Sequence, residues 1–185
     1  MIRAVTALDD PQLPLVLLRA ALSAVEGQAV VRQALSESPP EGPCHVIALG
    51  KAAAAMARGA RSVLDGGLAR ALVVSRQGHL DFTLCSDPRI RCVEADHPVP
   101  GPHSLEAGRQ LLAFIDSTPA DQCLLFLISG GTSSLVEVPV SGVGGDRLAA
   151  LNDWLLGAGL DIAVMNRVRS ALSRIKGGRL GQRRQ

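Results

Sequence analysis

Short apolar runs alternate with segments of helical periodicity along this chain, and that alternation limits the fold more than any other feature. The strand-type runs occupy residues 44–50, 70–75, 91–95 and 122–129. They are apolar on both faces, which is typical of parallel strands covered on both sides. The pattern therefore predicts an α/β fold, a three-layer α/β/α domain with a mostly parallel, Rossmann-like sheet.

Helices are expected in the segments between the strands. Residues 14–35 carry apolar positions at helical spacing, and Gly27 indicates a break there between two helices. Residues 76–90 carry no clear pattern. The remaining helices are predicted at 51–64, 104–116, 146–157 and 161–176, and Ser104 is predicted as the N-cap of its helix.

Composition argues against several classes of protein. The 185 residues are 47% hydrophobic but 2% aromatic, so the core is expected to be aliphatic. The formal net charge of +2 and the lack of tyrosine argue against a nucleic-acid surface. The N-terminus shows no signal-peptide pattern, and no apolar run reaches about 18 residues. We therefore expect a cytoplasmic protein with no membrane span.

The cysteines bear on the redox compartment. None of them has C-x-x-C spacing, and each one borders or begins an apolar run. We predict that Cys44, Cys85, Cys92 and Cys123 are reduced, small, half-buried residues. The alternative is a disulfide or a zinc site.

The junction Gly50-Lys51 is the first candidate functional site. Among 19 basic residues only Lys51 and Lys176 are lysines. Gly50 permits a sharp turn, and Lys51 follows at an expected helix start, where free N–H groups favour an anion. Lysine adds a compact, mobile cation that arginine does not reproduce. The junction predicts an anion-binding group, and the alternative is an exposed lysine in a first helical turn.

The most apolar strand run leads into a second candidate, the sequence SGGTSS. Two glycines permit a nest of N–H groups, and the hydroxyls add donors, which predicts a phosphate or carboxylate cradle. The alternative is a glycine-rich turn from strand to helix with a serine cap. The candidate residues are Ser129, Gly130, Gly131, Thr132, Ser133 and Ser134.

Two further candidates follow from spacing. The predicted helix 161–176 has an apolar stripe and, next to it, a polar stripe. We predict that the polar stripe forms an anion-binding edge, and the alternative is that it is a solvated face. The stripe consists of Asn166, Arg169, Ser173 and Lys176. His97 lies after a strand in a proline-rich loop, where it could orient a substrate, transfer a proton or cap the loop. No residues show metal-ligand spacing, so no metal site is predicted on the chain.

Four motifs in order resemble the type II glycerate 2-kinases, whose C-terminal part is called the MOFRL domain. They are VIALGKAAAAMA, DHPVPGPHS, LFLISGGTSSLVEVP and the segment 151–180. The resemblance implies ATP-dependent phosphorylation of D-glycerate to 2-phosphoglycerate, with ATP, Mg²⁺ and glycerate as ligands. It also implies two α/β domains with the active site between them. Some similar proteins are labelled hydroxypyruvate reductases.

The resemblance also implies roles for the candidate residues. Lys51 matches the functional lysine of the Gly-Lys motif and is the expected catalytic residue, beside Gly50. The segment 129–134 matches the Ser-Gly-Gly loop, and His97 matches the His-Pro-x-Pro loop. Asn166, Arg169 and Lys176 match the Asn-x-x-Arg and Lys-Gly-Gly elements.

The C-terminus departs from the resemblance, because GQRRQ does not look like the family's continuation. We expect residues 1–185 to be a truncated N-terminal α/β domain that lacks the C-terminal MOFRL domain and has little kinase activity alone. One alternative is an NAD(P)H-dependent hydroxypyruvate reductase, although no G-x-G-x-x-G motif supports it. The other is a non-catalytic, anion-binding remnant. The sequence leaves the oligomeric state open.

Overall fold

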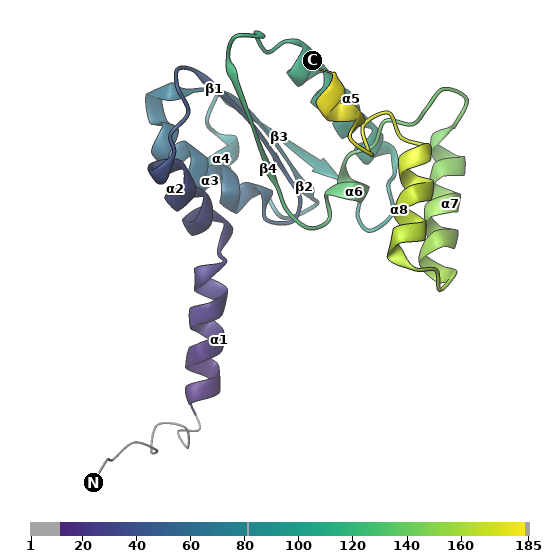
Figure 1. The fold of residues 1–185 in the computed structure, drawn as a ribbon, viewed down its shortest axis with the longest axis horizontal. Coiled ribbons are helices and arrows are strands. Elements are labelled where there is room, and N and C mark those ends of the chain that lie inside the picture. Colours follow the sequence, from purple (N-terminus) through teal and green to yellow (C-terminus); the bar gives the residue numbers. More distant parts are fainter. Residues whose placement is uncertain (1–11, 81, 184–185) are drawn as a thin grey trace.

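A four-stranded parallel sheet forms the centre of the computed structural model, which describes residues 12–80 and 82–183 (Figure 1). The strands in sheet order are β3 (Ile90–Ala95), β2 (Leu68–Arg76), β1 (Cys44–Leu49) and β4 (Cys123–Ile128). β1 pairs in parallel with both β2 and β4. The predicted strands are all present, and the predicted parallel α/β fold is confirmed.

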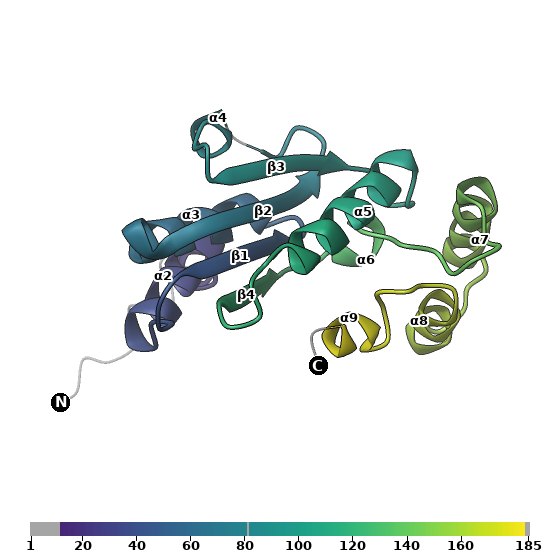
Figure 2. The same ribbon diagram turned by 90° about the horizontal axis from the view of Figure 1, so that it is seen from above.

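Helices cover both faces of the sheet, as Figure 2 shows. α2 (Gly27–Glu37) and α3 (Ala53–Leu64) pack on one face, where Val46 of β1 is buried. α5 (Pro102–Asp116) packs on the other face, where the next residue, Ile47, is buried. Because successive side chains of β1 enter opposite cores, the strand is apolar throughout.

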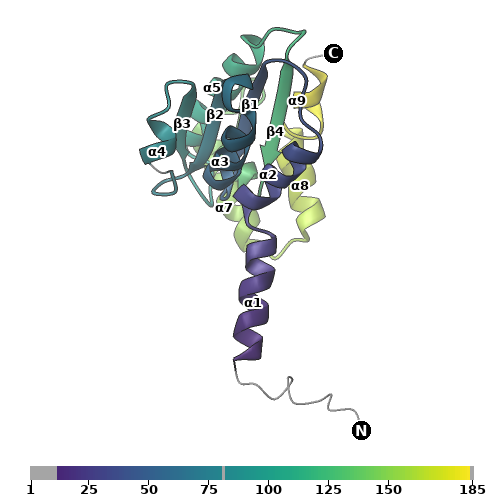
Figure 3. The ribbon, with the colours of Figure 1, turned by 90° about the vertical axis from the view of Figure 1, so that its left-hand side faces the viewer.

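α1 (Leu13–Ala24) extends away from the sheet (Figures 1 and 3). None of its residues is buried, and Leu17 is 59% exposed. Gly27 begins α2, so the predicted break within 14–35 is confirmed. No single helix in the described part of the chain could cross a membrane; α1 and α2 reach the required length and hydropathy only together, with a bend of 49°. The N-terminus, where we found no signal pattern, lies outside the described residues.

α7 (Gly145–Gly157) and α8 (Ile162–Ala171) lie side by side beyond the carboxyl ends of the strands (Figures 1 and 2). The predicted helix 161–176 is wrong beyond Ala171. There the backbone leaves the helix to pair with the chain before α7: the N–H of Arg174 donates to the Val138 carbonyl at 2.7 Å. The short helix α9 (Arg179–Gln182) follows.

The start of α5 differs from the prediction. Gly101 is the N-cap and Pro102 the first helical residue, so the prediction of Ser104 as N-cap is wrong. Proline favours the first helical position because its fixed φ suits the helix and it has no N–H to leave unpaired. Ser104 instead lies in the first turn, where its Oγ accepts the N–H of Gly101 at 3.4 Å.

The segment without a clear pattern after β2 contains a short helix, α4 (Phe82–Cys85). Cys85 and Cys92 form a disulfide, with Cα atoms 5.7 Å apart. The prediction of a reduced cysteine is wrong for this pair, because the reversal between α4 and β3 brings the two residues within bridging distance. Cys44 and Cys123 are free, with Sγ atoms 3.5 Å apart. Burial, with a smaller contribution from Cys123, raises the pKa of the Cys44 thiol to about 12.

Glycine allows α2 and α3 to approach closely. A Cβ at Gly59 would clash with the backbone carbonyl oxygen of Gln28 in α2. Gly59→Ala should therefore destabilise the fold by about 1–3 kcal/mol, because backbone atoms cannot rotate away from the added methyl group. Thermal unfolding measures the loss. Gly157→Ala is the control, since its Cβ would meet nothing within 4 Å, and equal losses in both variants would contradict the close packing.

Candidate functional site

Backbone hydrogen bonds join the carboxyl ends of β1 and β4. The N–H of Ser129 donates to the Leu49 carbonyl at 2.9 Å, and the N–H of Lys51 donates to the Gly130 carbonyl at 2.9 Å. Gly50 has a φ of +117°, and a Cβ there would clash with Ser129. Glycine is therefore required at this position, and the Gly-Lys junction lies directly against the Ser-Gly-Gly loop.

Most hydroxyl groups of the loop stabilise the loop itself. Thr132 Oγ1 donates to the carbonyl oxygens of Ser129 at 2.8 Å and Leu49 at 3.1 Å. Ser134 Oγ donates to the Gly131 carbonyl at 3.1 Å. Within the described part of the chain, Ser133 is the loop residue whose hydroxyl has no protein partner, and it is exposed. Ser133 is thus the loop hydroxyl free to contact a ligand.

Lys51 and His97 meet across Gly131. A Cβ at Gly131 would lie 3.2 Å from Lys51 Cγ and 3.3 Å from His97 Nε2. Burial first, then the charges of Lys51 and Arg76, lower the pKa of His97. Neither Lys51 nor Arg76 forms an ion pair with another described residue. The carboxyl ends of β1, β2 and β4 and the loop after β3 therefore form an edge with uncompensated positive charge.

A pocket of about 450 Å³ lies on the other side of the loop, toward α8. The predicted site residues that line it are Thr132, Ser133, Asn166, Arg169 and Lys176. Lys51 and His97 are not among the residues lining this pocket. The structure thus brings the candidate residues to one end of the sheet in two groups. Thr132 connects them, because it lines the pocket and bonds to β1.

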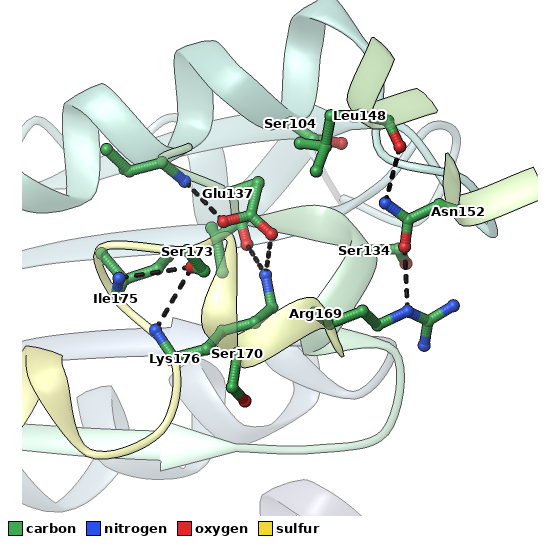
Figure 4. A network of polar contacts seen from close by, with 12 residues as sticks. Ser104, Ser134, Glu137, Leu148, Asn152, Arg169, Ser170, Ser173, Ile175 and Lys176 are labelled. Carbon is green, nitrogen blue, oxygen red and sulfur yellow. Dashed lines mark hydrogen bonds and ion pairs between the residues drawn. The ribbon is translucent and has the colours of Figure 1, made fainter. Parts of the chain in front are cut away.

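Lys176 is paired within the protein (Figure 4). Its Nζ forms an ion pair with Glu137 Oε2 and donates to the Val136 carbonyl at 3.3 Å. Glu137 is 2% exposed, and its other carboxylate oxygen accepts the N–H of Val138 at 2.9 Å. Burial lowers the pKa of Lys176, and the adjacent Glu137 opposes that shift. Lys176 therefore contributes little net charge to the pocket.

Three residues of this region were not predicted from the sequence. Arg76 ends β2, and the rule that ligands bind at the carboxyl ends of parallel strands could have identified it. Glu137 stands in the apolar run LVEVPV, where a buried carboxylate requires a cationic partner. Asn152, which accepts a hydrogen bond from Arg169 at 2.8 Å, gave no signal in the sequence.

The buried pair of Glu137 and Lys176 makes a testable contribution to stability. Glu137→Gln should lower the free energy of unfolding by about 3–5 kcal/mol at pH 7, because it leaves a buried ammonium group without its counter-ion. Urea denaturation measures this. Glu106→Gln is the matched control, since Glu106 pairs with Arg109 on the exposed surface of α5, and its midpoint should be unchanged. A midpoint for Glu137→Gln like that of wild type would contradict the pairing.

The contact between Lys51 and His97 predicts a change in titration. Removing the cation in Lys51→Ala should raise the pKa of His97, because a nearby positive charge disfavours the imidazolium form. An NMR titration of the imidazole resonances measures the pKa. Arg91→Ala, at the start of β3, removes a cation from the opposite end of the sheet and should leave the pKa unchanged. If the pKa of His97 were unshifted in Lys51→Ala, the two side chains would not be in contact.

Curated relatives match this chain along part of their length. The D-glycerate 2-kinase of Thermotoga maritima is 37% identical over 138 residues, which are 75% of this chain and 32% of that protein. A putative hydroxypyruvate reductase of Agrobacterium vitis is 42% identical over 141 residues, 76% of this chain and 36% of that protein. This chain thus spans about a third of the length of these relatives.

The fold has a close counterpart among solved structures. The crystal structure of a glycerate kinase from Thermotoga maritima superposes with a TM-score of 0.84 and 32% sequence identity, covering 93% of this chain and 41% of that one. The family described as "Domain of unknown function (DUF4147)" matches residues 15–185. That match covers nearly the whole sequence, including both groups of candidate residues, and the chain therefore belongs to the DUF4147 family.

Proposed function

We propose that this chain is the glycerate- and phosphate-binding part of a glycerate 2-kinase, which phosphorylates D-glycerate to 2-phosphoglycerate with ATP. One observation carries the proposal: Lys51, without a counter-ion among the described residues, lies against Gly131 and opposite His97. Relatives that match this chain are named glycerate kinases in Thermotoga maritima, Pyrococcus horikoshii and Homo sapiens. These names support the choice of substrate.

The residues suit phosphoryl transfer, which requires positioning and positive charge more than covalent chemistry from the protein. The bond from the γ-phosphorus to the ADP oxygen breaks, and a bond to the C2 hydroxyl oxygen of glycerate forms. Lys51 and Arg76 balance the charge of the transferred group, beside the phosphate-binding loop 129–134. In this proposal His97, whose pKa is lowered first by burial and then by the charges of Lys51 and Arg76, accepts the hydroxyl proton.

The described residues offer no all-protein cage for a Mg²⁺ ion. Within the described residues there is no group of three His, Cys, Asp or Glu side chains that could hold a metal. Asp96, the carboxylate next to His97, already accepts the N–H of His103 at 2.8 Å at the start of α5. In the proposal Mg²⁺ therefore enters with the phosphates of ATP, which supplies the phosphoryl group.

A second candidate function rests on the names of relatives in Agrobacterium vitis, which are putative hydroxypyruvate reductases. Hydride transfer would need a nicotinamide site, and the chain has no G-x-G-x-x-G motif. Oxidation of NADH that depends on both hydroxypyruvate and this chain would favour the reductase over the kinase.

Binding of D-glycerate tests the proposal directly on this chain. Lys51→Ala should weaken the affinity about tenfold or more, because one charge-assisted contact to the ligand contributes about 1.5–3 kcal/mol. Isothermal titration calorimetry with D-glycerate and with ATP measures the two affinities. Arg91→Ala is the control and should bind as the wild type does.

The matching experiment on turnover uses the full-length Thermotoga maritima kinase. Alanine at its equivalent of Lys51 should lower kcat by about 10²–10³, the effect of removing a group that stabilises developing charge. Turnover within a few-fold of wild type, or equal affinities of the wild-type chain and Lys51→Ala for both ligands, would refute the assignment.

A further inference from the structure

The two basic side chains that line the pocket beside the loop are each held by a buried polar side chain from another element (Figure 4). Glu137 holds Lys176, and Asn152 of α7 holds Arg169 of α8. Glu137 and Asn152 are 2% and 3% exposed. The two arrangements differ in charge, because a carboxylate neutralises Lys176 whereas a neutral amide holds Arg169.

Asn152 is fixed in one orientation. Its Nδ2 donates to the Leu148 carbonyl one turn earlier in α7, at 2.8 Å. Its Oδ1 accepts from Nε of Arg169, at 2.8 Å. Because an arginine nitrogen can only donate and a carbonyl can only accept, these two partners determine which end of the amide faces α8. The buried amide therefore offers Arg169 a single acceptor.

This contact uses one nitrogen of the guanidinium group and leaves two. Nη1 and Nη2 of Arg169 donate to no other described residue, and Figure 4 shows them pointing away from Asn152. No carboxylate in the described part of the chain forms an ion pair with Arg169. Since Lys176 is neutralised, Arg169 is the uncompensated cation of this pocket.

We infer that Asn152 is a positioning residue that orients Arg169 to bind the carboxylate of the substrate in this pocket. The inference rests on the proposed function, because glycerate carries one carboxylate. Two adjacent N–H donors of a guanidinium match the two oxygens of a carboxylate, provided that the planar group is held in place. The hydrogen bond from Nε of Arg169 to Asn152 Oδ1 holds the plane of this group.

A double-mutant cycle tests whether Asn152 acts through Arg169. The affinity for D-glycerate is measured by calorimetry in wild type, Asn152→Ala, Arg169→Ala and the double variant, with a thermal unfolding curve for each. We expect each single variant to bind about tenfold more weakly and the double variant to bind no more weakly than Arg169→Ala. Asp153→Asn, at the exposed neighbouring position in α7, is the control and should bind like wild type.

A readout without ligand follows the orientation itself. The Nε–H of Arg169 should give a slowly exchanging NMR signal in wild type that disappears in Asn152→Ala, because the buried acceptor is gone. If Asn152 only stabilised the fold, Asn152→Ala would lower the unfolding temperature equally with and without Arg169. Its effect on the affinity for D-glycerate would then add to that of Arg169→Ala.

The outcomes separate the two proposals. If Arg169→Ala weakens binding but Asn152→Ala does not, or if the two effects add, the positioning role is wrong and the glycerate site stands. If wild type binds no D-glycerate, or if Arg169→Ala binds like wild type, the carboxylate site is refuted along with this role. Loss of the Nε–H signal together with a non-additive loss of affinity would support the inference.

Discussion

β1 lies between β2 and β4, and its parallel pairing with both strands determines the geometry of the site region. Parallel pairing places the carboxyl ends of all these strands at the same edge. At that edge the backbone N–H of Lys51 bonds to the Gly130 carbonyl, and Gly50 is the residue that permits so close an approach. The lysine and the loop 129–134 are thus neighbours through the sheet, although about eighty positions separate them in sequence.

The charges at this edge are arranged in two ways. Lys51 and Arg76 form no ion pair with an acidic residue in the described part of the chain, and burial first, then these two charges, lower the pKa of His97. Lys176, the other lysine of the chain, is instead buried against Glu137. An unpaired cation at a surface can meet an anionic ligand, whereas a buried pair mainly fixes the surrounding backbone. The two lysines therefore differ in charge compensation, although both lie at this end of the sheet.

Local sequence patterns predicted a helix or strand correctly where a single physical rule determines its residues. The strands were predicted because their apolar character is needed on both faces, and the break at Gly27 because glycine is poor within a helix. The helix 161–176 failed beyond Ala171, because backbone pairing between Arg174 and Val138 outweighs helical propensity there. The prediction of reduced cysteines failed for Cys85 and Cys92 for a similar reason, because a chain reversal that no spacing rule describes brings the two residues within bridging distance.

Local sequence patterns were enough to predict the α/β class, the strands and the Gly-Lys and Ser-Gly-Gly segments, because each depends on the residue types in one short stretch. The contacts between distant side chains could be known only from the folded chain. It joined His97 to Lys51 across Gly131 and gave Lys176 its buried partner. Such contacts depend on strand order and on how α7 and α8 pack beyond the sheet, and those arise from long-range burial and hydrogen bonding that no local pattern records.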